Sequence, residues 1–533
     1  MSRKAKSLMF LGTGSDVGKS LLTAAFCRIL KNDGYRVAPF KAQNMALNSY
    51  ITREGGEMGR AQVVQAEAAG IDPHVDMNPI LLKPTSQVGS QVIVRGKVVG
   101  NFSAMDYYRY KRELLPIVRE SFERLARDYD VVVLEGAGSA VELNLKAHDI
   151  VNLAMAEMAD ARCILIGDID RGGIFAALLG SYMLLSPAEQ DRMIGFLVNK
   201  LRGDPKLFAG GVEIIESRSG KPVLGVVPHL DQLTLPEEDS VALARRMRRN
   251  PRPAGSNDKL AVGVVRLPFI SNYTDFDCFE QGPEVHLTYF DQTRMAFDFD
   301  AVILPGSKNT LEDLAFLRRT GLAEAIVAFY KSGGTVVGIC GGYQMLGLSV
   351  NDPHGVESSL RQVPGLGLLE METEMYLDKV TSQVEAEILG AADVFAADSS
   401  LQPGGHCSPA DTARHLAAPL SGYEIHMGRS SATGPCRPLF RITQRDGRTV
   451  DEVDGLMGPD GRVWGTYIHG IFDNDGFRRE FLRSLQARAG KSHICLSGGF
   501  DYRLQKEQQY DLLAQHVRQH IDLPRIYQAI GLA

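Results

Sequence analysis

Short apolar runs alternate with helix-forming patterns through most of the chain. In the first half, six runs rich in β-branched and aliphatic residues have the length of buried strands: Ser7–Leu11, Arg36–Phe40, Asp130–Leu134, Cys163–Gly167, Ile194–Val198 and Val223–Val227. Helical patterns lie between them, at Lys19–Lys31, Gly59–Ala69 and Ile150–Ala159. Apolar strands with helices between them predict an α/β fold whose mostly parallel sheet is covered on both faces.

A second series of strands occupies the other half: Leu260–Leu267, Ala301–Leu304, Thr335–Ile339, Tyr423–His426 and Val463–Ile468. We therefore expect two α/β domains, residues 1–240 and 260–490. A linker at 241–259 is predicted because Arg245–Ser256 is basic and contains proline and glycine. A solvated linker is favoured over a nucleic-acid site here, since the chain is acidic overall.

Two segments lie outside this pattern. Residues 390–419 are rich in Ala, Gly, Ser, Asp and Pro, which predicts a solvent-exposed insertion. Three potential metal ligands in it lack companions at ligand spacing, so we expect loop residues: His406, Cys407 and His415. Residues 491–533 form a C-terminal extension with a polar helical pattern at Leu504–Ile521.

Composition narrows the classes of partner. The net charge of −6 gives no reason to expect nucleic acid or an anionic membrane. Seven cysteines without a C-x-x-C pair indicate reduced thiols in a cytoplasm. No apolar run reaches the roughly 20 residues of a membrane helix, and the basic N-terminus lacks the apolar stretch of a signal peptide, so no membrane association is expected.

The first strand runs directly into a glycine-rich turn, Gly12–Ser20, and a helical pattern follows. This layout predicts a phosphate-binding loop, in which Lys19 neutralises phosphate charge and Ser20 can ligate Mg²⁺. The first glycine stands one residue earlier than the general ATPase spacing requires. The form G-T-x-x-D-x-G-K-S resembles dethiobiotin synthetase and its relatives. The predicted ATP-binding residues of the loop are Thr13, Gly14, Asp16, Gly18, Lys19 and Ser20.

Polar side chains follow further strands of the predicted sheet. Glu135 ends one strand beside glycines, and the carboxyl ends of parallel strands share one edge, so we expect a Mg²⁺ ligand there, direct or through water. The run Asp168–Gly173 should line the same edge. Asn199 follows a third strand, where its amide could bind the adenine of ATP. Asparagine at a strand end is also a common turn former.

The stretch Val336–Gln344 begins as a β-branched run and ends in G-x-C-x-G around Cys340. Small residues on both sides of a nucleophile suit a sharp strand-to-helix turn, which also points a helix N-terminus at the sulfur. A buried structural cysteine is the alternative for such a motif alone.

A base and an oxyanion turn occur elsewhere in the second half. His469 follows a strand and can serve as general base. Gly306 lies in a Pro-Gly-Ser turn after a strand, where backbone N–H groups could stabilise an oxyanion. This order resembles class I glutamine amidotransferases, which implies glutamine-binding roles for Gly306, Gly341 and Gln344. Ile471 stands where that family has its glutamate, so no third carboxylate is expected, as in the Cys–His dyads of cobyrinate-type amidotransferases.

The combination of the two halves resembles the cobyric acid synthase family over nearly the whole chain. The motifs that carry the resemblance are Lys41–Ser49, Glu57–Gln62, Met77–Pro84, Asp168–Gly173, Leu304–Thr310, Gly422–Gly428 and Thr466–Asp473. The resemblance implies a ligase that uses ATP, Mg²⁺ and L-glutamine to amidate the b, d, e and g carboxylates of a corrinoid, adenosylcobyrinic acid a,c-diamide. It also suggests that Gln43–Asn48 and Asn78–Lys83 face the corrinoid, although turn roles are equally open.

Two other functions are compatible with parts of this pattern. One is the related a,c-diamide synthase that acts earlier, which the chain length and the runs Gln43–Asn48 and Asp168–Gly173 disfavour. The other is a non-catalytic nucleotide- or corrinoid-binding protein without glutaminase activity. The intact Cys340 and His469, with Lys19 and Ser20, argue against it.

Overall fold

The structure is a computed structural model of the chain and describes residues 5–84, 89–236, 258–390, 418–496 and 500–532. The chain divides into two compact units. The first comprises Met1–Ala46, Glu57–Pro236 and Leu504–Ala533, and the second comprises Leu47–Gly56 and Glu237–Arg503. Each unit thus includes a segment that the contiguous domains 1–240 and 260–490 do not assign to it. Most of the predicted linker 241–259 and insertion 390–419, with its His and Cys residues, lies outside the described residues.

A six-stranded parallel sheet forms the centre of the first unit, in the order β12-β11-β10-β1-β9-β2. The six strands predicted from the sequence are confirmed, as β1 (Lys6–Gly12), β2 (Val37–Phe40), β9 (Val131–Glu135), β10 (Arg162–Asp168), β11 (Met193–Leu201) and β12 (Val223–Pro228). β1, the strand before the phosphate loop, pairs with β9 and β10. The predicted site residues follow the carboxyl ends of β1, β9, β10 and β11. Because these strands are parallel and share one sheet, those ends meet at one sheet edge.

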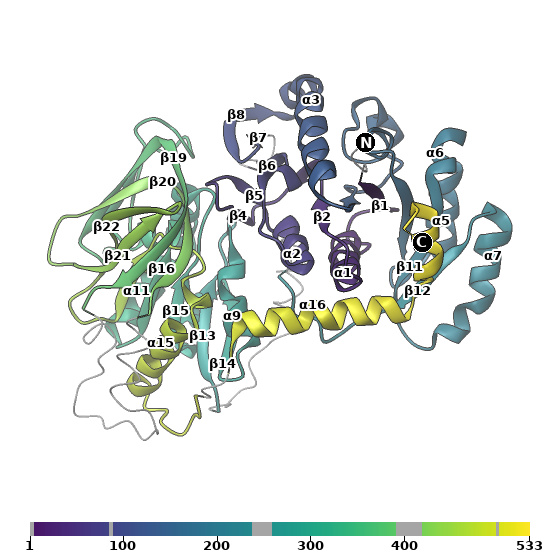
Figure 1. The fold of residues 1–533 in the computed structure, drawn as a ribbon. Coiled ribbons are helices and arrows are strands. Elements are labelled where there is room, and N and C mark those ends of the chain that lie inside the picture. Colours follow the sequence, from purple (N-terminus) through teal and green to yellow (C-terminus); the bar gives the residue numbers. More distant parts are fainter. Residues whose placement is uncertain (1–4, 85–88, 237–257, 391–417, 497–499, 533) are drawn as a thin grey trace. The chain divides into compact units, whose positions relative to one another are not determined.

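Helices connect these strands (Figure 1): α1 (Lys19–Asn32), α2 (Arg60–Ala69), α3 (Ala104–Asp128), α4 (Leu153–Met158), α5 (Ile174–Met183), α6 (Pro187–Arg192) and α7 (Ala209–Ser219). α4 begins later than predicted, because the Asp149 side chain accepts hydrogen bonds from the backbone N–H groups of Val151, Asn152 and Ala154. A smaller sheet follows β2 in the chain. It consists of β3 (Gln43–Met45), β6 (Ile80–Pro84), β7 (Gly89–Val94) and β8 (Lys97–Ser103).

The second unit is built on an eleven-stranded mixed sheet. Its first part is parallel and consists of β14 (Val285–Phe290), β13 (Leu260–Val265), β15 (Ala301–Leu304), β16 (Thr335–Ile339) and β23 (Val463–Thr466). Its second part includes β22 (Arg448–Met457), β21 (Arg437–Arg445), β19 (Met371–Ile388), β17 (Ser349–Asn351), β18 (Gln362–Pro364) and β20 (Leu420–Ala432). The predicted strand Tyr423–His426 is the centre of the longer β20.

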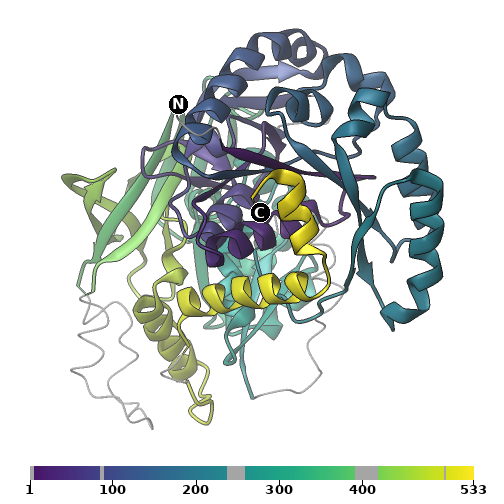
Figure 2. The same cartoon turned by 45° about the vertical axis from the view of Figure 1, so that its right-hand side comes forward.

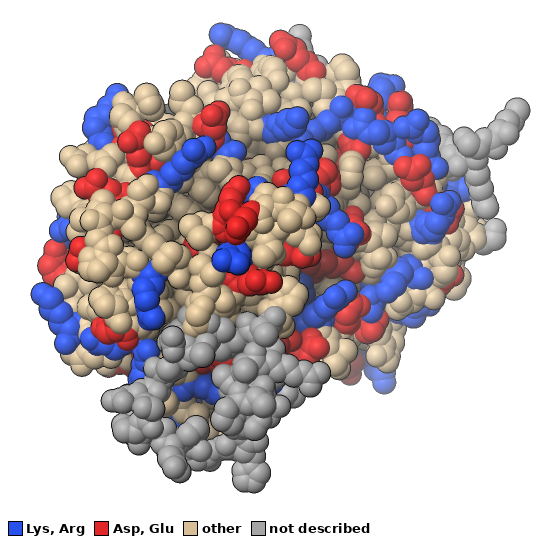
Figure 3. All heavy atoms as spheres, turned by 60° about the vertical axis from the view of Figure 1, so that its left-hand side comes forward, with Lys and Arg blue, Asp and Glu red and all other residues tan. Residues whose placement is uncertain are grey.

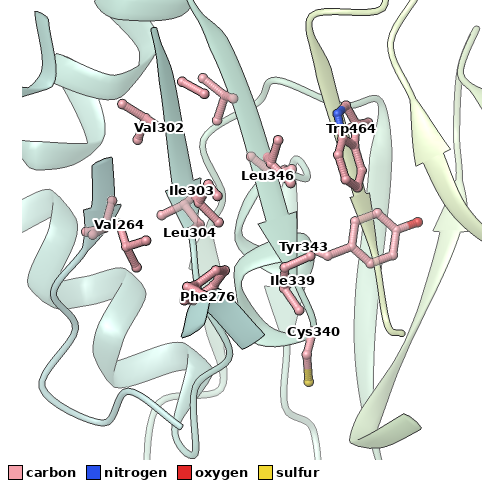
Figure 4. Packing of buried hydrophobic residues seen from close by; sticks show 14 of the residues in the cluster. Val264, Phe276, Val302, Ile303, Leu304, Ile339, Cys340, Tyr343, Leu346 and Trp464 are labelled. Atoms are coloured by element: carbon pink, nitrogen blue, oxygen red, sulfur yellow. The ribbon is translucent and has the colours of Figure 1, made fainter. Parts of the chain in front are cut away.

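Helices of the second unit follow its parallel strands: α9 (Asp277–Gln281), α10 (Thr310–Thr320), α11 (Leu322–Lys331), α12 (Gly341–Met345) and α15 (Asp475–Arg488). Trp464 of β23 is 1% exposed and packs edge-on against Phe477 and Phe481 of α15. Figure 4 shows this interior beside β15 and β16, whose side chains Ile303, Leu304 and Ile339 fill it. The sheet end at β16 is therefore held rigidly.

The C-terminal helices belong to the first unit. α16 (Tyr502–Gln519) runs along α1 and α2 and is followed by α17 (Leu523–Ile530), both yellow in Figure 2. Arg28 of α1 is buried and forms ion pairs with Glu507 and Asp511 of α16, at 2.9 and 2.7 Å. Tyr510 of the same helix and Ile526 of α17 lie in the core of the first unit. The predicted helix Leu504–Ile521 is thus confirmed, with its ends shifted by two residues.

The surface carries both signs of charge. Lys and Arg side chains alternate with Asp and Glu over the face shown in Figure 3. Exposed pairs such as Arg36–Asp130 and Arg266–Asp291 have N···O distances of 2.9 Å, and each pair stabilises the fold by at most about 1 kcal/mol. Among the described residues, no helix combines the length and apolar character needed to cross a membrane.

We expect Ile526→Ala to destabilise the first unit by about 2–5 kcal/mol, because it leaves a cavity at a fully buried position. Trp464, the single tryptophan, lies in the second unit. Chemical denaturation followed by circular dichroism should therefore show a lower midpoint, while the Trp464 fluorescence transition keeps its position. Arg525→Ala, at an exposed neighbouring position, is the control. An unchanged circular-dichroism transition in the Ile526 variant would contradict this role of α17.

Candidate functional site

Cys340 stands at a strained turn between β16 and α12. Its backbone angles are φ 52° and ψ −110°, a combination that costs a non-glycine residue roughly 1–3 kcal/mol. Its backbone N–H donates to Thr466 O of β23 at 2.8 Å. Figure 4 shows the sulfur projecting from the end of β16. This is the strand-to-helix turn that the G-x-C-x-G pattern predicts.

Close backbone approach explains the glycines around Cys340. A Cβ at Gly338 would lie 2.6 Å from Gly342 O, and a Cβ at Gly342 would lie 2.0 Å from Leu304 O. Neither distance is possible without moving the backbone. The glycines let α12 start directly against β15 and β16. Cys340 is thereby fixed at the sheet edge rather than on a free loop.

His469 follows β23 and is paired with a carboxylate. The imidazole is 1% exposed, and its Nδ1 lies 2.6 Å from Asp275 Oδ2. The other oxygen of Asp275 accepts the Gly470 N–H at 3.1 Å, which fixes the carboxylate. Burial alone would lower the pKa of His469. The negative charge of Asp275, then interaction with Cys340 including a hydrogen bond, outweighs burial and raises that pKa to about 10.

Asp275 corrects the expectation that no third carboxylate serves His469. Ile471, at the position where class I enzymes have their glutamate, is buried in the core. The carboxylate comes instead from the short 3-10 helix η4 (Tyr273–Phe276), which follows β13. Asp275 lies 194 residues from His469 in the chain. The one sequence signal for it is a polar run, Ser271–Asp275, after an apolar strand.

The predicted oxyanion turn lies beside this pair. Gly306 O accepts the Ser271 N–H at 2.9 Å, which joins the turn to the segment before η4. A Cβ at Gly306 would lie 3.1 Å from His469 Cε1, and a Cβ at Gly341 would lie 2.9 Å from Ser307 N. The Pro-Gly-Ser turn, the cysteine turn and the imidazole are therefore adjacent. This arrangement allows attack by a sulfur with a general base and nearby backbone N–H groups.

Gln344 lies in α12 and is 2% exposed. Its Oε1 accepts a hydrogen bond from Thr310 Oγ1 at 3.0 Å, and its Nε2 donates to Tyr467 Oη at 3.2 Å. The side chain thus bridges the N-terminus of α10 and the strand end before His469. A direct contact of Gln344 with glutamine stays a prediction.

Other buried cysteines differ from Cys340 in their surroundings. Cys163 lies inside β10, and desolvation raises the pKa of its thiol to about 12 despite two nearby arginines. Cys27 lies in α1, where burial, then the charge of Glu135, raises its pKa further. Both thiols therefore stay neutral near pH 7 and unsuited to nucleophilic attack.

In the first unit, Lys19 closes the predicted phosphate loop. Its Nζ donates to Gly14 O at 2.8 Å and to Gly138 O at 2.9 Å. Gly18 has φ +99°, and a Cβ there would lie 2.1 Å from Asn199 Nδ2. A Cβ at Gly12 would lie 2.8 Å from Lys19 Nζ. A side chain at position 12 would collide with Lys19. This explains why the first glycine of the loop stands at position 12 rather than at position 13.

Glu135 is the centre of a buried polar cluster. Its Oε1 accepts from Ser20 Oγ at 2.8 Å and from Lys41 Nζ at 2.9 Å, and its Oε2 accepts from Gln65 Nε2 at 2.6 Å. Burial opposes ionisation of Glu135. The Lys41 charge and the three hydrogen bonds outweigh it and lower the pKa of the carboxyl. Lys41 and Gln65 were not among the predicted site residues.

The adjoining Ser20 and Glu135 fit a magnesium ion, because a hydroxyl and an ionised carboxylate are the oxygen donors that Mg²⁺ prefers. The described part of the chain contains no group of three or more His, Cys, Asp or Glu side chains that could hold a metal alone. Phosphate oxygens and water would have to complete the coordination, as in other phosphate-loop sites.

Asn199 contacts the loop from the end of β11. Its Nδ2 donates to Val17 O at 2.9 Å, so this amide proton supports the loop backbone. The adjacent Lys200 donates to Asp16 O and to Asp168 Oδ2, the latter at 2.9 Å. Asp16 in turn accepts from Arg171 at 3.0 Å. Asp16, Asp168 and Asn199 therefore meet at the predicted edge, and adenine binding by Asn199 stays a prediction.

Two families of known proteins match the chain, and the boundary between the two matches falls at residues 243–260. Residues 8–242 match a family described as a CobQ/CobB/MinD/ParA nucleotide binding domain. Residues 261–477 match a family described as a CobB/CobQ-like glutamine amidotransferase domain. The phosphate loop with Glu135 lies in the first match, and Cys340, His469 and Asp275 lie in the second.

Curated relatives match both parts together. A cobyric acid synthase of Syntrophobacter fumaroxidans is 68% identical over 532 residues, which cover 100% of either chain. Cobyric acid synthases of Photorhabdus laumondii and Sorangium cellulosum are each 48% identical, over 98% and 99% of both chains. The chain is thus an α/β enzyme with a nucleotide-binding and a glutamine amidotransferase domain, and it belongs to the cobyric acid synthase family.

Proposed function

We propose that the protein uses ATP and L-glutamine to amidate the b, d, e and g carboxylates of adenosylcobyrinic acid a,c-diamide, giving adenosylcobyric acid in cobalamin biosynthesis. The observation that carries the proposal is that the chain holds two separate chemistries, a thiol–imidazole–carboxylate constellation and a phosphate loop with an ionised buried carboxylate. A ligase that makes amides from glutamine requires both. Identity to cobyric acid synthases over the full length supports the corrinoid as acceptor.

In the second unit, His469 takes the proton of the Cys340 thiol, and the sulfur attacks the side-chain amide carbon of glutamine. Backbone N–H groups at the Gly306 turn and at Gly341 stabilise the resulting oxyanion. The C–N bond breaks as His469 gives a proton to the leaving ammonia, which leaves a glutamyl thioester on the sulfur. His469 then takes a proton from water, whose hydroxide cleaves the thioester to glutamate, and returns that proton to the sulfur to restore the thiol. Asp275 holds the imidazole in orientation and stabilises its protonated form.

In the first unit, a corrinoid carboxylate takes the γ-phosphoryl group of ATP. This step is needed because ammonia cannot displace oxide from a carboxylate, whereas phosphate leaves readily from an acyl phosphate. Lys19 and the backbone N–H groups of the loop stabilise the charge on the transferring group. Mg²⁺ held by Ser20 and Glu135 would supply further charge neutralisation. Ammonia then attacks the acyl carbon, phosphate leaves, and the amide forms.

Mass spectrometry of the corrinoid product tests the proposal. The protein is incubated with ATP, Mg²⁺, glutamine and adenosylcobyrinic acid a,c-diamide, and in parallel with cobyrinic acid. Four successive replacements of a carboxylate by an amide are expected with the diamide. A product from cobyrinic acid that stops after two amides would instead indicate the earlier a,c-diamide synthesis.

Cys340→Ala should abolish glutamine-dependent amidation, at least about 1000-fold, because no other group forms the thioester. Amidation with ammonium chloride should stay within about twofold of wild type, since the phosphate loop is unchanged. Lys19→Ala is the reciprocal control and should lose both syntheses. Glutamate release that survives in the Cys340 variant would contradict the assignment of the nucleophile.

Asp275→Asn should lower the turnover number for glutamine hydrolysis on the order of 100-fold or more, since the imidazole loses its orienting carboxylate. Asp275 raises the pKa of His469, so the amide should lower that pKa. Protonated His469 would then be lost at lower pH. The alkaline limb of the pH–rate profile should therefore move to lower pH, while ammonia-dependent amidation is unchanged. A wild-type profile in this variant would remove Asp275 from the mechanism.

A further inference from the structure

The motif Lys41–Ser49 is divided between the two units. Its first residues, through Ala46, belong to the first unit, and the segment Leu47–Gly56 belongs to the second. Lys41 binds Glu135 beside the phosphate loop at 2.9 Å. Asn48 and Ser49, which belong to the second unit, are fully buried. One short run of chain thus contributes polar groups to the interior of both units.

Segment Leu47–Gly56 is held by hydrogen bonds around η4 and β20. Asn48 Oδ1 accepts the Tyr273 N–H at 3.2 Å. The Ser49 N–H donates to Asn272 Oδ1 at 3.4 Å, and Ser49 O accepts from Tyr423 Oη at 3.4 Å. Asn272 Nδ2 also donates to Tyr423 Oη at 3.0 Å. Backbone and side-chain groups of the segment therefore form one network with Asn272, Tyr273 and Tyr423.

This network contacts both members of the acid–base pair. Asn272 has φ +52° and caps η4, the turn that presents Asp275. A non-glycine residue keeps this conformation only if its surroundings hold it. The Tyr423 ring stacks on the His469 imidazole, with centroids 5.2 Å apart and an interplanar angle of 18°. The two residues also exchange backbone hydrogen bonds, at 2.8 and 3.2 Å.

Lys41, which precedes segment Leu47–Gly56 in the chain, offers a physical cause for movement of that segment. Its ammonium shares Glu135 Oε1 with the Ser20 hydroxyl. A cation bound by Ser20 and Glu135 would repel that ammonium and weaken its hold on Glu135. The free energy of nucleotide binding therefore depends on where Lys41 lies. A conformational response to nucleotide requires such a dependence. Six residues of chain lie between Lys41 and Asn48.

We propose that Asn48 and Tyr423 are positioning residues for glutamine hydrolysis, and that segment Leu47–Gly56 makes the His469–Asp275 pair respond to occupancy of the phosphate site. This inference rests on the proposed function. Asn48 and Tyr423 act on the chemistry indirectly. Both act through the placement of Asp275 and His469.

The test measures glutamate release with glutamine alone and with ATP, Mg²⁺ and adenosylcobyrinic acid a,c-diamide added. Tyr423→Phe keeps the ring on His469 but removes the hydroxyl that binds Asn272 and Ser49. Asn48→Ala removes the acceptor for Tyr273 N–H. In each variant the stimulation by ATP and corrinoid should fall on the order of fivefold, the effect of losing one buried hydrogen bond. Ammonia-dependent amidation should not change in Tyr423→Phe.

Two further variants sharpen the result. A Gly-Gly insertion between Ala46 and Leu47 keeps every side chain of the network but slackens the link to Lys41, and it should remove the stimulation while glutamine alone is still hydrolysed. Tyr330→Phe is the matched control, since it also loses a tyrosine hydrogen bond, to Asp460 at 2.8 Å, away from this network. If Tyr423→Phe does not fold, as thermal unfolding would show, the insertion carries the test.

Wild-type stimulation in the Tyr423, Asn48 and insertion variants together would overturn the proposal. The proposal would also be overturned if adding ATP and corrinoid left the rate of glutamine hydrolysis by the wild-type protein unchanged. Failure of the proposed function can be told apart from failure of this inference. In the former case, wild-type protein makes no amide product with ATP and ammonium chloride. That measurement does not involve Cys340, His469 or the segment.

Discussion

The close approach of three glycine backbones is the constraint on which the second unit depends. Gly338, Gly341 and Gly342 allow β16, α12 and the turn after β15 to meet at distances that no side chain would permit. This packing forces Cys340 into its strained conformation, and the hydrogen bond to Thr466 O holds it there. The same packing places β23 beside β16, so that His469 follows at the same sheet edge. Chemistry and fold are therefore specified by the same contacts.

Each unit contains a buried carboxylate at its site, and several partners hold it. Glu135 and Asp275 are each nearly inaccessible to water, and each carboxylate is held by a side-chain partner and by further hydrogen bonds. The surroundings of such groups need little reorganisation when charge develops nearby, because their dipoles are already oriented. Removing one partner would leave an unpaired buried charge, which is far more costly than the pair is stabilising.

Much of the architecture is predictable from the sequence, because buried parallel strands are continuous apolar runs. β15 and β16 occupy the predicted ranges, and the glycine patterns at Gly12–Gly18 and Gly338–Gly342 mark real close approaches. Asp275 was missed because its relation to His469 exists only in three dimensions. The long strand β19 was missed because its alternating exposed and buried residues give no apolar run. Membership of Leu47–Gly56 in the second unit is likewise a property of packing alone.

The division of the first unit between both ends of the chain bears on its synthesis. Its sheet and phosphate loop are made before the second unit, but α16, which pairs with α1, and α17, which contacts β1 and β12, are made after it. At about 5–20 residues per second, the intervening second unit delays them by tens of seconds. During that time the core of the first unit lacks the side chains of Tyr510, Val517 and Ile526. The first unit therefore stays incomplete until α16 is made, and a chain that stops before Leu504 would hold the second unit whole and the first without its C-terminal helices.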